Sequence, residues 1–182
     1  MTWTLLTLLL TAHAADPVSM LTPGQPLPII KSEYLSGRKV ELPAAIAGKV
    51  ALLAIGFSYD SRWAVEAWSN QFRKEFERDS RVTWFEIPMI GGAARLGKWF
   101  IDSGMRRGTP KQLQENVITV YGGVDAWKRR LGFENDRDAH LVLVDSTGTV
   151  RWIYKEHLVQ EQLSPAKFAE LTALVRQLAE RQ

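Results

Sequence analysis

GKVALLAIGFSYDSRWAVEAWSNQFRKEF, residues Gly48 to Phe76, decides the fold of this chain. The run from Val50 to Phe57 is continuously apolar and too short for an independent helix, which predicts a central strand buried on both faces. A helix with one apolar side follows, carrying Ala64, Val65, Trp68, Phe72 and Phe76 at helical spacing. Ligands of open α/β sheets gather beyond the carboxyl ends of such strands. The loop from Ser58 to Trp63 is therefore the predicted functional edge.

The rest of the chain alternates strands and helices. Further strands are predicted at Arg38–Leu42, Val82–Ile87 and Val117–Tyr121, and as a hairpin of His140–Val144 with Thr149–Tyr154. Helices are predicted at Ala93–Met105, at Val124–Leu131 and after a Ser164 cap. In the first of these, Leu96, Trp99, Phe100 and Ile101 are predicted to face the core. The order predicts an α/β domain whose mixed sheet carries helices on both faces.

Composition limits the partners and the compartment. The formal net charge of +3 is too small to imply nucleic acid as a partner. The first 14 residues, MTWTLLTLLLTAHA, have the apolar stretch and small residues of a secretory signal, which predicts cleavage after Ala14. The predicted product has an extended, proline-rich lead-in at 15–32 and one domain at 33–182, with no membrane span. We expect a monomer that is periplasmic or secreted.

Two segments resemble the thioredoxin-like superfamily. PGQPLP, Pro23 to Pro28, followed by a strand and AGKVALLAIGF, resembles the opening of exported thioredoxin-like and peroxiredoxin-like domains. VYGGVDAWKRRLGF with HLVLVDSTGTVRW, Val120 to Trp152, resembles their later half. The resemblance implies a three-layer fold with an N-terminal strand extension. It places the redox cysteines at about Asp60 to Ala64 and a cis-proline near Ala139, and this sequence has neither.

The sequence contains no cysteine. Thiol-disulfide exchange and thiol peroxidase chemistry both require a thiolate, so neither can occur here without an added cofactor. Among cysteine-free relatives, the chain resembles the mitochondrial ATP synthase assembly factor family called ATPase ten, in WFEIPMI, GMRRG, TVYGG and LVDSTGTVRW. That resemblance implies a chaperone-like role in assembling a membrane subunit.

Aromatic and arginine side chains mark a candidate binding surface, because these residue types dominate protein interfaces. Trp63 and Trp152 are the tryptophans predicted to be exposed, whereas Trp68, Trp84 and Trp99 have predicted core positions. The predicted binding residues are Ser58, Tyr59, Asp60, Arg62, Trp63, Arg106, Arg107, Arg151 and Trp152. Their partner would be another protein, with the Ser58 loop as the contact edge.

A catalytic alternative stays open. Gly56-Phe-Ser58-Tyr-Asp60 nearly matches the nucleophile elbow G-x-S-x-G, and Asp145 and His157 follow in the order of α/β hydrolases. A small serine hydrolase would use Ser58 as its nucleophile. The simpler interpretation is that Ser58 and Asp60 cap the helix that follows. His140 and His157 are 17 residues apart with no H-x-x-x-H spacing, so neither a metal nor another cofactor is expected.

Overall fold

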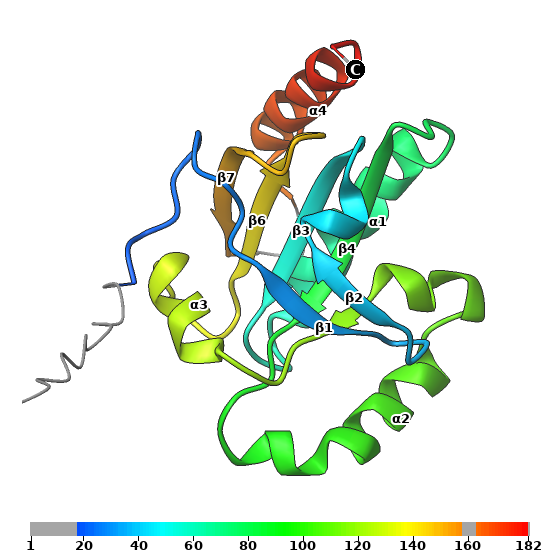
Figure 1. Cartoon of the computed structure of the whole chain (residues 1–182), viewed down its shortest axis with the longest axis vertical. Helices are drawn as coiled ribbons and strands as arrows, with labels where there is room; N and C mark the ends of the chain where they lie inside the picture. The colour runs from blue at the N-terminus through cyan, green and yellow to red at the C-terminus, as the bar shows by residue number, and fades with distance from the viewer. Residues whose placement is uncertain (1–17, 158–162, 182) are drawn as a thin grey trace, which may run out of the picture.

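The computed structural model describes residues 18–157 and 163–181. The predicted signal peptide and its cleavage site lie outside these residues. The main sheet has four strands in the order β4-β3-β6-β7 (Figure 1), namely β3 (Val50–Gly56), β4 (Val82–Pro88), β6 (Ala139–Val144) and β7 (Val150–Glu156). β3 pairs parallel with β4 and antiparallel with β6, and every one of its residues is buried. The predicted central strand is confirmed.

Two helices cover one face of this sheet, α1 (Arg62–Phe76) and α4 (Pro165–Ala179). The apolar side of α1 is buried as its spacing predicts, and Trp68 is completely enclosed by aromatic neighbours. Ser164 caps α4 by accepting a hydrogen bond from the amide of Lys167, at 3.4 Å. Both helices follow from apolar periodicity, and α4 also from its capping residue.

A second small sheet and α3 (Val124–Arg130) cover the other face. The small sheet has the order β2-β1-β5, namely β1 (Ile30–Tyr34), β2 (Lys39–Leu42) and β5 (Ile118–Thr119). β2 is an edge strand as expected, but β1 was not expected, because it begins directly after the proline-rich stretch. Its alternation brings Ile30 and Tyr34 into the core. Helices on both faces of a mixed sheet are confirmed.

The insertion after β4 differs most from expectation. A 3-10 helix, Gly92–Gly97, leads into α2 (Lys98–Gly108). Leu96, Trp99 and Phe100 face solvent, and Trp99 is 77% exposed, whereas Ile101 is partly buried. The prediction that Leu96, Trp99 and Phe100 face the core is therefore wrong, because α2 turns Asp102 to its buried side. Within residues 18–157 and 163–181, none of the helices is both long and apolar enough to span a bilayer.

Gly56 ends β3 where the start of α1 packs closest. A Cβ atom there would lie 2.4 Å from Ser61 Oγ and 3.2 Å from Val65 Cγ2. We expect Gly56→Ala to lower the free energy of unfolding by about 1–2 kcal/mol through overpacking, measured by urea denaturation. Gly104→Ala in α2 is the matched control, since its Cβ meets nothing within 4 Å. Equal stability of the two variants would contradict this account of Gly56.

Candidate functional site

The loop between β3 and α1 is built by two serine hydroxyls. Ser58 Oγ accepts hydrogen bonds from the amides of Asp60, at 3.0 Å, and Ser61, at 3.2 Å. The same hydroxyl donates to the carbonyl oxygen of Asp136, and Ser61 Oγ donates to the Ser58 carbonyl at 2.8 Å. Ser58 therefore holds the turn that precedes α1. The prediction that Ser58 and Asp60 cap the helix is wrong in detail, because Ser61 is the N-cap residue and the Ser58 hydroxyl binds amides before the first helical residue, Arg62.

The Arg62 guanidinium is stacked on two exposed aromatic rings. It lies 3.5 Å from the ring centroid of Tyr59 and 4.1 Å from that of Trp63, both within cation-π range. Tyr59 is 76% exposed and Trp63 is 56% exposed, which confirms the predicted exposure of Trp63. We call these three residues the aromatic-arginine cluster. Arg62 Nη1 is buried and has no hydrogen-bond partner among the described residues.

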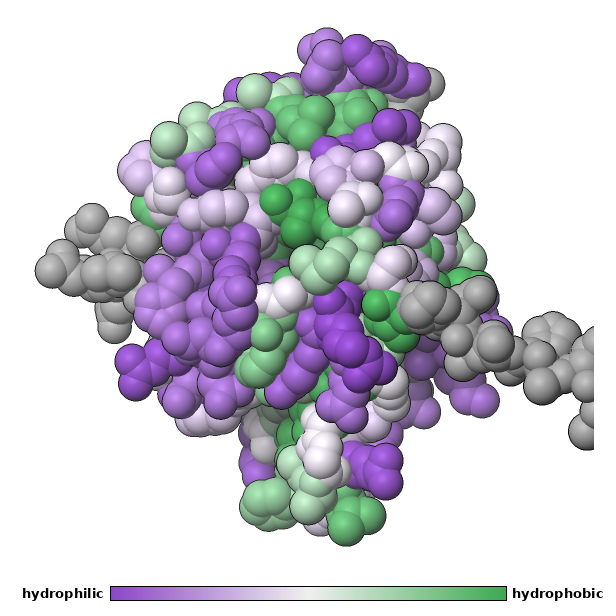
Figure 2. Space-filling view, turned by 90° about the vertical axis from the view of Figure 1, so that its left-hand side faces the viewer, coloured by the Kyte–Doolittle hydropathy of each residue, from purple (hydrophilic) through white to green (hydrophobic). Residues whose placement is uncertain are grey.

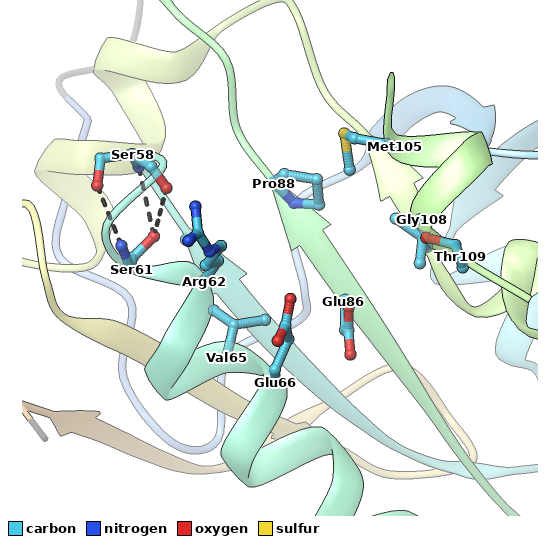
Figure 3. Close-up of a pocket in the computed structure, with 12 residues that line it drawn as sticks. Ser58, Ser61, Arg62, Val65, Glu66, Glu86, Pro88, Met105, Gly108 and Thr109 are labelled. Atoms are coloured by element: carbon cyan, nitrogen blue, oxygen red, sulfur yellow. Dashed lines mark hydrogen bonds between the residues drawn. The ribbon is translucent and has the colours of Figure 1, made fainter. Parts of the chain in front are cut away.

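A pocket of about 230 Å³ opens beside this cluster, at the carboxyl ends of β3 and β4. Figure 3 shows the side chains of the Ser58 loop and α1 on one side, Pro88 and Glu86 in the middle, and α2 with the residue after it on the other side. Its apolar walls come from Val65, Pro88, Met105 and Val117, and its polar groups include Arg62, Glu66 and Glu86. The pocket is large enough for one long side chain of a partner.

Glu86 is the most perturbed carboxyl group of the pocket. Burial, reinforced by the negative charge of Glu66, raises the pKa of Glu86 to about 7, although Ser69 and Arg73 act in the opposite direction. Near neutral pH this carboxyl therefore exchanges between its neutral and charged forms. Sequence reasoning missed Glu86 and Glu66. The available signal was a single acidic residue inside the strand VTWFEI.

The pocket offers polar groups that can bind a ligand. It combines the guanidinium of Arg62 with two carboxyl groups, and the hydroxyls of Ser58 and Ser61 donate to the carbonyl oxygens of Asp136 and Ser58. Across residues 18–157 and 163–181, no group of three or more histidine and acidic side chains is placed to hold a metal ion. A partner that offers hydrogen-bond acceptors to Arg62 would satisfy its buried nitrogen.

The structure does not bring the predicted hydrolase residues together. Gly56 pairs with Ala139 and Ala51 with Val144, so Ser58 and Asp145 lie beyond opposite ends of the sheet. Asp145 instead accepts hydrogen bonds from Thr147 and Thr149 and pairs with Arg151, at 2.5 Å. The carboxylate therefore stabilises the hairpin turn, a role that the Asp145-Ser-Thr-Gly sequence typically serves.

His157 does lie at the same end of the sheet as Ser58, because Glu156 pairs with Ala139. Its Nδ1 atom is 2.9 Å from a carboxylate oxygen of Asp138, which is buried and which sequence reasoning did not select. The Ser58 proton is directed to the Asp136 carbonyl rather than to this imidazole. In the sequence, the one signal that Asp138 is buried beside His157 was its position directly before a buried strand.

Two of the predicted binding residues lie elsewhere. Trp152 is buried against Trp68, and its indole Nε1 donates to Glu170 at 2.7 Å, so the prediction that it is exposed is wrong. Alternation along β7 points Trp152 towards the α1 and α4 layer, which the sequence did not reveal. Arg151 is held at the far end of the sheet by Asp145. Arg106 and Arg107 lie on α2 between two residues that line the pocket, but neither is among its lining residues, and Arg106 lies instead beside Lys98 and Asp102.

Comparison with known proteins gives a structural likeness only. No protein-family model matches the chain, and no curated protein matches it in sequence. The resemblance to the ATPase ten family is therefore not supported by sequence comparison.

Solved structures do match. The thioredoxin domain of a thiol-disulfide oxidoreductase from Bacteroides vulgatus is 16% identical, with a TM-score of 0.56 over 85% of this chain and 99% of that one. A peroxiredoxin-like protein from Aquifex aeolicus is 14% identical, with a TM-score of 0.55 over 87% and 88%. BsSco, a member of the Sco family of cytochrome c oxidase assembly proteins, is 12% identical, with a TM-score of 0.55 over 88% and 98%. With a central strand, flanking helices and terminal hairpin in this order, the chain has the thioredoxin-like fold.

Proposed function

We propose that this protein is an exported, non-redox thioredoxin-like protein that binds another protein, as an assembly or chaperone-type factor for a membrane complex. The observation that carries the proposal is the exposed aromatic-arginine cluster, Tyr59, Arg62 and Trp63, beside the pocket. It occupies the carboxyl edge of the central strands, where ligands of α/β folds bind.

The chemistry of the cluster favours a protein partner. Tryptophan, tyrosine and arginine are the residues that most often dominate binding energy at interfaces. Stacking on two rings orders the Arg62 guanidinium before any partner arrives, which reduces the entropy lost on binding. The buried, unpaired Nη1 atom adds a donor that a carbonyl or carboxylate of the partner can satisfy.

The assembly role rests on two likenesses. The first is the resemblance of the quoted segments to the ATPase ten family, which sequence comparison does not support. The second is the fold of BsSco, a member of the Sco family of cytochrome c oxidase assembly proteins. The sequence has no cysteine, so a shared role would be one of binding and not of thiol chemistry. The predicted signal peptide places this role in the periplasm or outside the cell.

Crosslinking of the tagged protein in its native cells, followed by identification of captured proteins from the solubilised envelope, tests the proposal. We expect one membrane-complex subunit. Arg62→Ala and Trp63→Ala should each weaken its binding by roughly 30-fold, the loss typical of a hot-spot residue, as measured by titration calorimetry. The melting temperature should hardly change, because Trp63 is exposed and the partly buried Arg62 makes no salt bridge among the described residues.

Lys74→Ala is the matched control, since Lys74 is an exposed cation on the same helix. Its binding should equal that of the unmodified protein. A large loss of stability in Arg62→Ala would show instead that the cluster serves the fold. Absence of any specific protein partner would overturn the proposal and would favour a small molecule as the occupant of the pocket.

A further inference from the structure

Helix α2 is attached to the domain through its polar side. Lys98 Nζ lies 2.6 Å from an Asp102 carboxylate oxygen and 3.0 Å from one of Glu33, on β1. The Tyr121 hydroxyl donates to the other oxygen of Asp102 at 2.6 Å. Asp102 is almost fully buried, so this hydrogen-bonded group faces the protein.

The outward side of the same insertion is apolar. Leu96 is 86% exposed and Phe100 is 71% exposed, and both lie beside the exposed Trp99. We call these three residues the apolar tip. α2 projects from the sheet at the lower end of the molecule in Figure 1, and Figure 2 shows hydrophobic next to hydrophilic side chains at that end. A helix of a soluble domain normally has the opposite orientation, with its apolar side towards the core.

The insertion that carries the apolar tip is basic. The segment 92–111 contains five basic residues and one acidic residue, Asp102. Asp102 pairs with Lys98, whereas Arg95, Arg106 and Arg107 form no salt bridge with any carboxylate of residues 18–157 and 163–181. The insertion therefore combines exposed apolar side chains with arginines that have no carboxylate partner among the described residues.

We propose that the apolar tip docks on an anionic phospholipid surface, with Leu96, Trp99 and Phe100 in the headgroup boundary. Tryptophan, phenylalanine and leucine on one side with arginine at the margins is the composition of helices that lie in a membrane interface. Arginines close to such a surface are attracted by anionic headgroups. A second copy of this chain is a poorer occupant, because it would bring the same unpaired arginines together.

Docking would also position the binding site. α2 contributes Met105 and Gly108 to the pocket beside the aromatic-arginine cluster. A domain held at a bilayer through the apolar tip would therefore have one wall of that pocket on its membrane-bound helix. This inference does not depend on the proposed function, because lipid binding by α2 and protein binding at Arg62 involve different residues.

The sequence provides a specific way to test the docking. Since the chain has no cysteine, a single Leu96→Cys substitution allows one fluorophore to be attached at the apolar tip. With the full chain and vesicles of phosphatidylcholine and phosphatidylglycerol, we expect nitroxide-labelled lipids to quench this fluorophore. The same fluorophore at Lys74→Cys, an exposed position on α1, should not be quenched.

Three controls test whether anionic headgroups are needed for the apolar tip to bind vesicles. Quenching at position 96 should be lost in vesicles of phosphatidylcholine alone, and each of Arg95→Ala and Arg107→Ala should weaken vesicle binding through the tip about fivefold. If position 96 is not quenched in anionic vesicles, the inference is wrong, even if the chain binds them through its apolar first residues. Dimerisation lost in Trp99→Ser, without quenching by lipid, would identify a second copy as the occupant and would equally overturn it.

Discussion

Replacing Glu86 with glutamine is expected to raise the free energy of unfolding by about 2–3 kcal/mol at about pH 8 and to leave it nearly unchanged at about pH 4. Burial and the charge of Glu66 raise the pKa of this carboxyl from 4.5 to about 7 in the folded protein. Between these values the folded state keeps a proton that the unfolded state has released. The free energy of unfolding therefore falls as pH rises from 4.5 to 7, and a neutral amide removes that fall.

Urea denaturation of both proteins across this pH range measures the effect. Glu66→Gln should give a smaller stabilisation, because it removes only the neighbouring charge and leaves burial unchanged. Glu77→Gln applies the same chemical change at an exposed position just after α1 and should have little effect at any pH. If the free energy of unfolding changed with pH in the same way for Glu86→Gln and the unmodified protein, the pKa of Glu86 would not be raised by folding.

Replacing His140 with phenylalanine should remove a loss of stability on the acid side. His140 is buried between Phe57 and Phe133, with ring centroids 5.2 Å and 6.4 Å away, and burial lowers its pKa from 6.5 to about 4. Its Nε2 atom has no hydrogen-bond partner among the described residues. As pH falls from 6.5 to 4, the unfolded state takes up a proton that the folded state refuses, so the free energy of unfolding falls.

Between pH 6.5 and pH 4, the free energy of unfolding of the unmodified protein should fall by about 2 kcal/mol more than that of His140→Phe. Urea denaturation measures both values. Comparing slopes cancels any constant packing change caused by the new ring. Glu86 lowers stability as pH rises and His140 lowers it as pH falls. Apart from a constant packing change, Glu86→Gln should therefore be more stable than the unmodified protein at the alkaline end of the range, and His140→Phe at the acid end. An unchanged acid slope in His140→Phe would mean that some other group is responsible for acid sensitivity.

Two features define the proposed binding surface: its place in the loop after β3, and the packing of Arg62 against two aromatic rings. The position, the loop after the central strand, could be inferred from the run Val50 to Phe57 alone. The detail is the Arg62 guanidinium stacked on Tyr59 and Trp63, which depends on the start of α1 and its side-chain conformations. Tyr59 lies in the loop before α1 and Trp63 directly follows Arg62, so helical spacing does not predict that the three side chains meet.

Long-range pairing could not be predicted. Asp145 and Ser58 looked compatible with one site until the antiparallel register of β3 and β6 placed them beyond opposite ends of the sheet. Trp152 looked exposed beside Arg151, yet the α1 and α4 layer covers it. In both cases the outcome depends on which face or end of a sheet is covered by elements distant in sequence. A single strand carries no such information.

The sequence by itself determined the central strand, the apolar side of α1, the capped final helix and the absence of thiol chemistry. Each of these depends on local periodicity, on a cap or on a residue type. Only the tertiary structure decided that Glu86 shares a pocket with Arg62, and that α2 turns Asp102 inward and Trp99 outward. The physical reason is that α2 is amphipathic with two usable sides, and the hydrogen bonds available from Glu33 and Tyr121 select the polar one.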